Sequence, residues 1–235
     1  MKKIIISLLL LPLFVFGADN EVSVDQSGAT ANLDLEQLGS GNIIGGADAT
    51  AGDMTALDLD GITMTLDINQ IGSSNQFLGD ILADTFTGFF EFTGDSNIFN
   101  INVDKDNTYG ADDSNLNIQV TGDSNEFTLS QATSALAITL DLDWIINGSN
   151  NEITSTINYD LATNYMDIDG SDNVVNFTAS GYQGGYFYLD HTGGSRTFNI
   201  TQASTLDNDW LKILSTGSNG TLCVIQNDGG TAVGC

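Results

Sequence analysis

Residues 92–103 read FTGDSNIFNINV, and residues 120–131 repeat the pattern as VTGDSNEFTLSQ. Both stretches contain the spacing Gly-x-x-Asn, followed two residues later by Phe. The spacing is intact in six places and degenerate in two, Gly193 with Arg196 and Gly217 with Gly220. The intact copies are Gly39/Asn42, Gly72/Asn75, Gly94/Asn97, Gly122/Asn125, Gly148/Asn151 and Gly170/Asn173. Repetition at a fixed period is the signature of a repeat architecture.

The period of the repeat is about 23 residues. From Gly72 to Gly217, successive anchor glycines lie 22, 28, 26, 22, 23 and 24 residues apart. The second residue after the Asn position and the fourth residue before the glycine are apolar in all copies. The first set is Ile44, Phe77, Phe99, Phe127, Ile153, Val175, Phe198 and Leu222, and the second set is Leu35, Ile68, Phe90, Ile118, Trp144, Met166, Leu189 and Ile213.

Apolar and polar residues alternate around these positions, as Phe99, Ile101 and Val103 do with Asn100 and Asn102. Alternation with period two is typical of a β-strand that has one buried face. A single unit cannot bury that face, whereas parallel stacking places equivalent apolar residues above one another. The sequence therefore predicts an all-β fold, a β-solenoid of about eight stacked strand–turn–strand repeats. We expect each unit to have a Gly-x-x-Asn arch and a second turn half a period later.

The anchor residues suit a tight arch. Glycine tolerates positive φ, and asparagine tolerates the left-handed region and forms local hydrogen bonds. Stacked asparagines are also expected to bond from rung to rung as a ladder.

The N-terminus predicts an export signal. Lys2 and Lys3 precede a nearly continuous apolar run from Ile4 to Phe16, which is too short to span a bilayer. We expect a signal peptide at residues 1–17 and a single β-solenoid domain at residues 18–235. A buried N-terminal helix or a membrane anchor is the alternative. No second apolar run follows, so stable membrane insertion is not expected.

The charge of the mature chain excludes some partners. It would keep Lys105, Arg196 and Lys212 against all 31 acidic residues. Binding to nucleic acid requires clustered basic residues, so no nucleic-acid partner is expected. An anionic membrane surface is excluded by the sign of the charge. The 41% hydrophobic content argues for a folded core rather than disorder.

The two cysteines, Cys223 and Cys235, lie near the C-terminus of a chain that we expect to leave the cytoplasm. Disulfides persist in such compartments, so we expect these residues to pair and to tie down a C-terminal cap. Two cysteines and His191 are too few ligands for a zinc site.

The segments Gln37-Leu38-Gly39-Ser40-Gly41-Asn42 and Gln70-Ile71-Gly72-Ser73-Ser74-Asn75 resemble the curlin repeat, Gln-x-Gly-x-x-Asn. After Asn75, the Gln position holds other residue types, such as Phe92 and His191. The resemblance implies a secreted subunit of an extracellular, curli-like amyloid fibre that serves in surface adhesion or in a biofilm matrix. It also implies self-association, bacterial export through the periplasm and an outer-membrane pore, and a nucleator at the cell surface.

Candidate binding residues are few. Asp95 and Asp123 occupy the same arch position in consecutive units, where stacked carboxylates either bind a hard cation such as Ca²⁺ or serve only as turn residues. Tyr182, Tyr186 and Tyr188 suggest a glycan-binding face or a half-buried strand face. The alternative function is therefore a monomeric acidic adhesin that binds carbohydrate or calcium. No cofactor other than calcium is expected. No motif pairs a nucleophile with a base, so we expect no enzymatic activity.

Overall fold

The structure is a computed structural model that describes residues 21–45, 57–104, 110–133, 136–181, 185–204 and 209–228. These residues form sixteen strands and, within the described ranges, no helix. The strands are β1 (Glu21–Val22), β2 (Asp25–Ser27), β3 (Thr30–Leu38), β4 (Ile43–Ile44), β5 (Leu57–Ile71), β6 (Gln76–Thr93), β7 (Ile98–Val103), β8 (Ser114–Thr121), β9 (Glu126–Gln131), β10 (Ala137–Asn147), β11 (Glu152–Asp169), β12 (Val174–Gly181), β13 (Tyr186–Thr192), β14 (Arg196–Ser204), β15 (Trp210–Thr216) and β16 (Gly220–Asp228).

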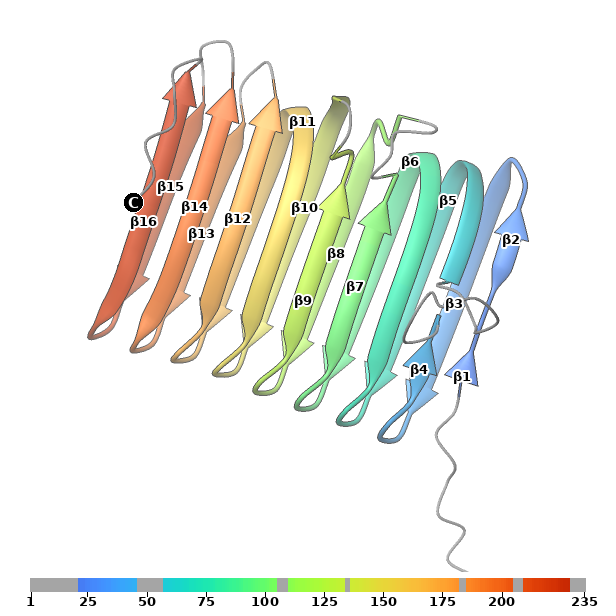
Figure 1. The fold of residues 1–235 in the computed structure, drawn as a ribbon, viewed down its shortest axis with the longest axis horizontal. Coiled ribbons are helices and arrows are strands. Elements are labelled where there is room, and N and C mark those ends of the chain that lie inside the picture. The colour runs from blue at the N-terminus through green and yellow to red at the C-terminus, as the bar shows by residue number, and fades with distance from the viewer. Residues whose placement is uncertain are drawn as a thin grey trace, which may run out of the picture.

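Two parallel sheets lie face to face and run the length of the molecule (Figure 1). The first sheet has the order β1-β4-β6-β7-β9-β11-β12-β14-β16. The second sheet has the order β3-β5-β6-β8-β10-β11-β13-β15. Every pairing among the described strands is parallel, as a chain that winds in one direction requires. The predicted all-β solenoid is confirmed.

The second turn differs from the prediction in three rungs. The strands β5, β6 and β11 are 15, 18 and 18 residues long and continue from one sheet into the other. Figure 1 shows them curving over the edge of the solenoid. In β11 the corner contains Leu161, which has a φ of 53° and is 54% exposed. A left-handed residue turns the chain there while pairing continues on both sides, so no separate loop is needed.

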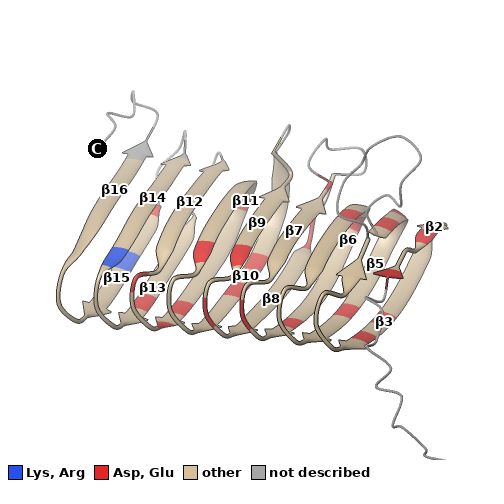
Figure 2. Cartoon of the chain, turned by 60° about the horizontal axis from the view of Figure 1, so that its bottom comes forward, with Lys and Arg blue, Asp and Glu red and all other residues tan. Residues whose placement is uncertain are grey.

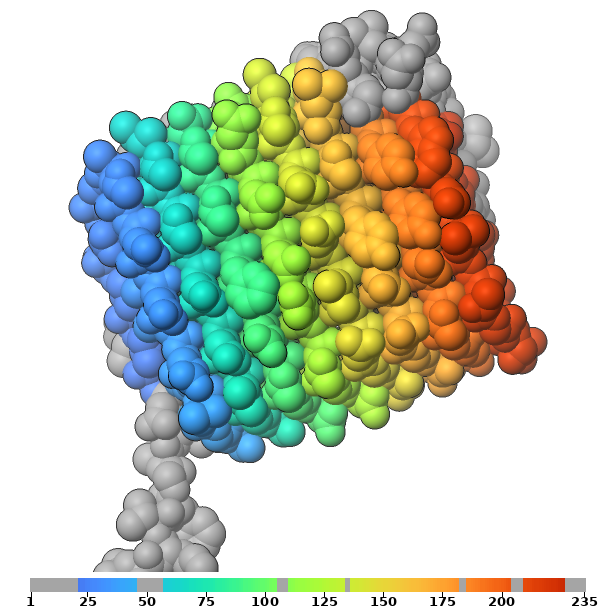
Figure 3. Space-filling model, turned by 180° about the vertical axis from the view of Figure 1, so that it is seen from behind, coloured from blue at the N-terminus to red at the C-terminus, as the bar shows by residue number. Residues whose placement is uncertain are grey.

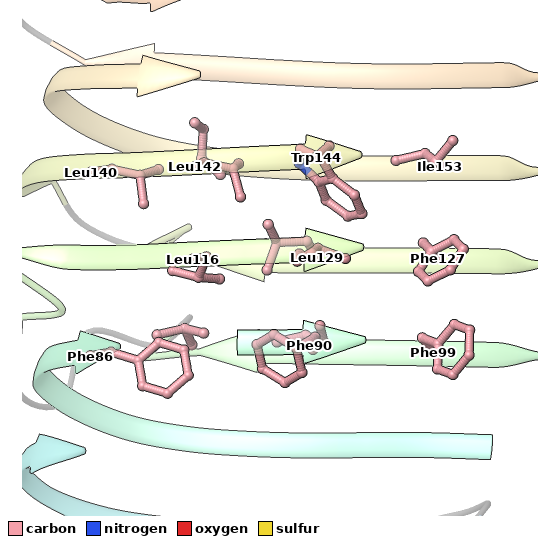
Figure 4. Close-up of a cluster of buried hydrophobic side chains, with 14 of the residues drawn as sticks. Phe86, Phe90, Phe99, Leu116, Phe127, Leu129, Leu140, Leu142, Trp144 and Ile153 are labelled. Carbon is pink, nitrogen blue, oxygen red and sulfur yellow. The ribbon is translucent and has the colours of Figure 1, made fainter. Parts of the chain in front are cut away.

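The core is a set of apolar columns that run along the solenoid. Phe77, Phe99, Phe127 and Ile153 are each at most 1% exposed and follow one another in register. The rings of Phe99 and Phe127 stack with centroids 4.6 Å apart. Figure 4 shows Phe99, Phe127 and Ile153 on successive strands, with Trp144 directed toward the same interior. The register that was predicted from the anchor spacing is thus the observed register.

Candidate functional site

The anchor glycines line one edge of the solenoid, where each arch lies directly against the arch of the preceding rung. Gly94 has a φ of +131° and Gly122 a φ of +139°. A Cβ at Gly122 would collide with the carbonyl oxygen of Gly94, and the same holds along the row from Gly72 to Gly217. Glycine is therefore required both by the backbone conformation and by the close approach of the neighbouring arch.

The left-handed residue of the arch is the third one, whose residue type varies between copies and gives no signal in the sequence. Ser74, Ser96 and Ser124 have φ values of 61°, 60° and 60°. The anchor asparagine was expected to tolerate this conformation, but it does not adopt it in the described arches. Its role is hydrogen bonding instead.

The anchor asparagines form a buried ladder that extends over six rungs. The backbone N–H of each asparagine donates to the side-chain Oδ1 of the asparagine on the next rung. The distances are 2.9 Å from Asn42 to Asn75, 2.8 Å from Asn75 to Asn97, 2.9 Å from Asn97 to Asn125, 2.8 Å from Asn125 to Asn151 and 2.9 Å from Asn151 to Asn173. The ladder thus joins side chain to backbone and satisfies a buried donor in each arch.

A second ladder runs beside the first, and it contains the residues proposed for calcium. The backbone N–H of Asp123 donates to Oδ1 of Asp95 at 2.7 Å, and the N–H of Ser149 donates to Oδ1 of Asp123 at 2.5 Å. The backbone N–H of Asp95 in turn donates to Oγ of Ser73 on the preceding rung, at 3.2 Å. Both carboxylates therefore have a structural role in the arches. No group of three or more His, Cys, Asp or Glu side chains that could hold a metal ion occurs in the described ranges.

The column at the Gln position changes character along the chain. The side-chain Nε2 of Gln70 donates to Oε1 of Gln37 at 2.8 Å, and this pair is buried. The column then becomes apolar and turns polar again at His191, which is fully buried, and at Ser215 beside it in the last rung. Its Nδ1 lies 3.0 Å from Oγ of Ser215 and its Nε2 lies 3.2 Å from the carbonyl oxygen of Gly170. Burial lowers the pKa of His191, so the neutral imidazole is the native form.

The asparagine ladder ends where Arg196 and Gly220 take the anchor position. Arg196 has no acceptor atom for the N–H of Asn173, and Gly220 has no side chain. The guanidinium of Arg196 instead donates to the carbonyl oxygen of Asn219 at 3.2 Å. The missing amides leave an open hollow of about 310 Å³ that is lined by Asp172, Asn173, Ser195, Arg196, Thr197, Asn219, Gly220 and Thr221.

Aromatic side chains stack along the outer face of the second sheet near the C-terminal end. Tyr186 and Trp210 stack with centroids 4.1 Å apart and an interplanar angle of 4°, and Tyr165 and Tyr188 stack at 5.2 Å and 4°. The ammonium group of Lys212 lies 4.9 Å from the ring of Tyr188. Each ring of a stacked pair thus has one face covered by its partner, and Tyr186 and Trp210 remain 42% and 41% exposed. Figure 3 shows the rungs side by side, viewed from the side opposite to Figure 1.

The last rung exposes core positions at an open edge. Within the described ranges, β15 pairs only with β13, and β16 pairs only with β14. Leu222 and Val224 lie in the apolar columns of β14 but are 48% and 36% exposed. Leu211 and Ile213 are partly buried at the corresponding edge of the second sheet. The first rung likewise presents Leu33 and Leu35 of β3, which pairs only with β5.

Charge is distributed unevenly along the molecule. Figure 2 shows acidic residues on most rungs and basic residues only near β15. The basic residues within the described ranges are Arg196 and Lys212, both in the last rungs. The two ends of the solenoid therefore differ in electrostatic character.

Several predicted features lie outside the described residues, namely the signal peptide, Lys105, Tyr182 and Cys235. Cys223 lies in β16, and its pairing with Cys235 stays a prediction. A helix long and apolar enough to cross a membrane is absent from the described ranges.

Comparison with known proteins gives no relative for this chain. No protein-family model matches it, and neither the curated proteins nor the solved structures contain a significant match.

Proposed function

We propose that this chain is a secreted structural protein that associates with copies of itself into curli-like amyloid fibres for surface adhesion or a biofilm matrix. Open strand edges at both ends of the described solenoid carry this proposal. An open parallel edge presents unpaired N–H and C=O groups that template pairing with another strand. The half-exposed Leu222 and Val224 add apolar surface that a further rung would bury.

The chemistry of the described residues supports a structural rather than a catalytic role. Its buried polar side chains belong mainly to the ladders between rungs, where they bind backbone groups or each other. His191 is the one histidine of the chain and is fully buried, and the partners of its ring nitrogens are the hydroxyl of Ser215 and a backbone carbonyl, with no carboxylate among them. We therefore propose that the protein is not an enzyme.

The proposal includes a route to the cell surface. The N-terminal signal would direct bacterial export through the periplasm, and the resemblance to curlin repeats would place an outer-membrane pore and a nucleator among its partners. The acidic mature chain would keep copies soluble before assembly through mutual repulsion. Acid or divalent cations would reduce this repulsion and promote growth of the fibres.

Electron microscopy and fibre diffraction of residues 18–235, with and without Ca²⁺ and at neutral and mildly acidic pH, test the proposal. Unbranched fibres with a meridional reflection at about 4.7–4.8 Å are expected. A β-rich monomer that persists under all these conditions would contradict it. That result would favour the alternative of a monomeric acidic adhesin, for which the Tyr186–Trp210 pair and calcium binding would then be examined.

A further inference from the structure

The two sheets contain unequal numbers of strands in the described part of the chain. The first sheet has nine successive strand positions, of which β1 and β2 together form the first and β16 the last. The second sheet has eight, from β3 to β15. We call residues 21–27, which contain β1 and β2, the guard strand. It covers the edge of β4 and the start of β5.

This inequality limits how two copies can stack. Consider a junction in which β16 of one copy pairs with the guard strand of the next copy. In the second sheet, β15 of the first copy and β3 of the next copy would then lie two strand spacings apart instead of one. The second sheet would then contain a gap at every junction, with unpaired backbone groups on both sides. If the guard strand left its place, β16 could pair with β4 and β5 while β15 pairs with β3. Both sheets would then continue without a gap.

The last strand carries the same kinds of inward-facing side chains as the guard strand. Following the register from rung to rung, Leu222 lies in the column of Val22, Val224 in the column of Val24, and Gln226 in the column of Gln26. The strand β16 of a neighbouring copy therefore fits the site of the guard strand.

The position of the guard strand is also destabilised by repulsion between like charges. Asp25 lies directly beside Asp58, which lies beside Asp80 on the next strand. Burial and the neighbouring carboxylates of Asp80, Asp25 and Asp60 raise the pKa of Asp58. Stacked like charges on adjacent strands are destabilising. In β16 the same column holds Ile225, so replacement of the guard strand removes one carboxylate from this row.

We propose that copies of this protein join head to tail by strand exchange, in which β15 and β16 of one copy pair with β3, β4 and β5 of the next and displace its guard strand. This inference rests on the self-association proposed above and defines the interface at which it occurs. The guard strand then protects the growing edge of the free subunit.

The register of this junction matches apolar and charged side chains. Leu211 and Ile213 would stack on Leu33 and Leu35 of the next copy, continuing the columns of the second sheet. On the outer face, the same register places Lys212 beside Asp34 of the next copy. An opposite-charge pair between adjacent strands favours this register and this polarity.

The same substitution at two equivalent positions tests the proposal. In residues 18–235, Val24→Asp weakens the guard strand, and Val224→Asp weakens the strand that replaces it. We expect Val24→Asp to speed fibre growth roughly tenfold, as loss of a half-buried valine implies, and Val224→Asp to slow it by a similar factor. Ser23→Asp, which adds the same charge at an exposed position of the guard strand, serves as the control. Circular dichroism of the monomers checks that each variant is folded before growth is measured.

The outcomes separate this inference from the proposed function. Opposite effects of the two valine substitutions support strand exchange. Slower growth of both variants means that the guard strand remains in the junction, which overturns the exchange and leaves the fibre function standing. A wild-type chain that never assembles overturns both. Lys212→Glu and Asp34→Lys should each slow growth, and the double variant should restore it, whereas an unrestored double variant would overturn the register.

Discussion

At the scale of single residues, each arch is stabilised by two acceptors that face the neighbouring rung. Oδ1 of Asn125 binds the backbone N–H of Asn97, and Oδ1 of Asp95 binds the N–H of Asp123. Both bonds connect a side chain to the backbone of an adjacent rung, so each rung helps to satisfy its neighbour. An aspartate, a serine and an asparagine can serve here because all three offer a short side chain with an oxygen acceptor.

Asn125→Ala should destabilise the fold. The substitution leaves the buried N–H of Asn97 without its acceptor, which costs about 1–3 kcal/mol. Asn115→Ala, at an exposed position of β8, is the matched control and should have little effect. Chemical denaturation of the three proteins measures the difference in free energy of unfolding. Equal losses in both variants would show that the ladder does not stabilise the arch.

His191 should make the stability of the fold depend on pH. Burial lowers its pKa in the folded protein, so the unfolded chain binds the proton more readily. The free energy of unfolding therefore keeps its full value above about pH 6.5. It decreases as the pH falls from that value toward the pKa of His191 in the folded protein. We expect the His191→Gln variant to lack this loss, because glutamine stays neutral and occupies the same column at Gln37 and Gln70. Parallel stability curves of variant and wild type between about pH 5 and pH 7 would contradict this account.

The residues of the ladders were only partly predictable from the sequence. The spacing Gly-x-x-Asn marks the arch because Gly72 must accept both a positive φ and a close neighbour. Asp95 and Asp123 were open to two interpretations, because aspartate is the expected residue type both for a side chain that accepts a backbone N–H in a turn and for a calcium ligand. The hydrogen bond from the N–H of Asp123 to Asp95 could be found only from the position of the next rung, and calcium binding at these carboxylates stays a prediction.

At the scale of strands, alternation predicted the inward columns but not the corners. Phe99 and Ile101 alternate with polar residues, and this pattern defines which face is buried. The strands β6 and β11 pass through a corner without a loop, and alternation continues on both sides of it. A bend at one residue such as Leu161 leaves no cluster of Gly, Pro or Asn that would mark a turn.

Phe99→Ala should remove a large part of the stability of the core. Phe99 is 1% exposed and stacks on both Phe92 and Phe127, with centroids 3.6 Å and 4.6 Å away. Truncation of a buried phenylalanine costs about 3–5 kcal/mol. Phe89→Ala offers a matched control, because Phe89 lies on the outer face and is 37% exposed. Thermal or chemical denaturation should show a much larger loss for Phe99→Ala than for Phe89→Ala, and similar losses would contradict the observed core.

The row of carboxylates beside β2 should weaken the first rungs at neutral pH. Asp58 has a raised pKa because of burial and its acidic neighbours, so its charged form is unfavourable in the folded protein. Asp58→Asn should therefore raise the free energy of unfolding at pH 7 by about 0.2–1 kcal/mol. The gain should disappear as the pH falls through the folded pKa, where wild-type Asp58 is already protonated. A gain that persists at low pH would mean that repulsion is not its cause.

At the scale of the whole molecule, an excess of negative charge is combined with open strand edges at both ends of the described solenoid. The sequence has 31 acidic residues and 5 basic ones, and the basic residues of the described ranges lie in the last rungs. Repulsion between the acidic faces opposes lateral contacts, whereas the strand edges favour contact along the axis. The proposed fibres would therefore grow linearly and with one polarity. Composition predicted the charge, but the unequal sheets depend on where the chain enters and leaves the solenoid.

The most direct test of this account is the mass per unit length of fibres that form from residues 18–235, measured by scanning transmission electron microscopy. Strand exchange adds eight rungs per copy, so one chain is predicted for every 38 Å or so of fibre axis in a single protofilament. Retention of the guard strand at each junction would give about 43 Å per chain. A chain that remains monomeric, or fibres whose mass per length fits no whole number of stacked solenoids, would contradict the claim that this protein assembles by end-to-end stacking.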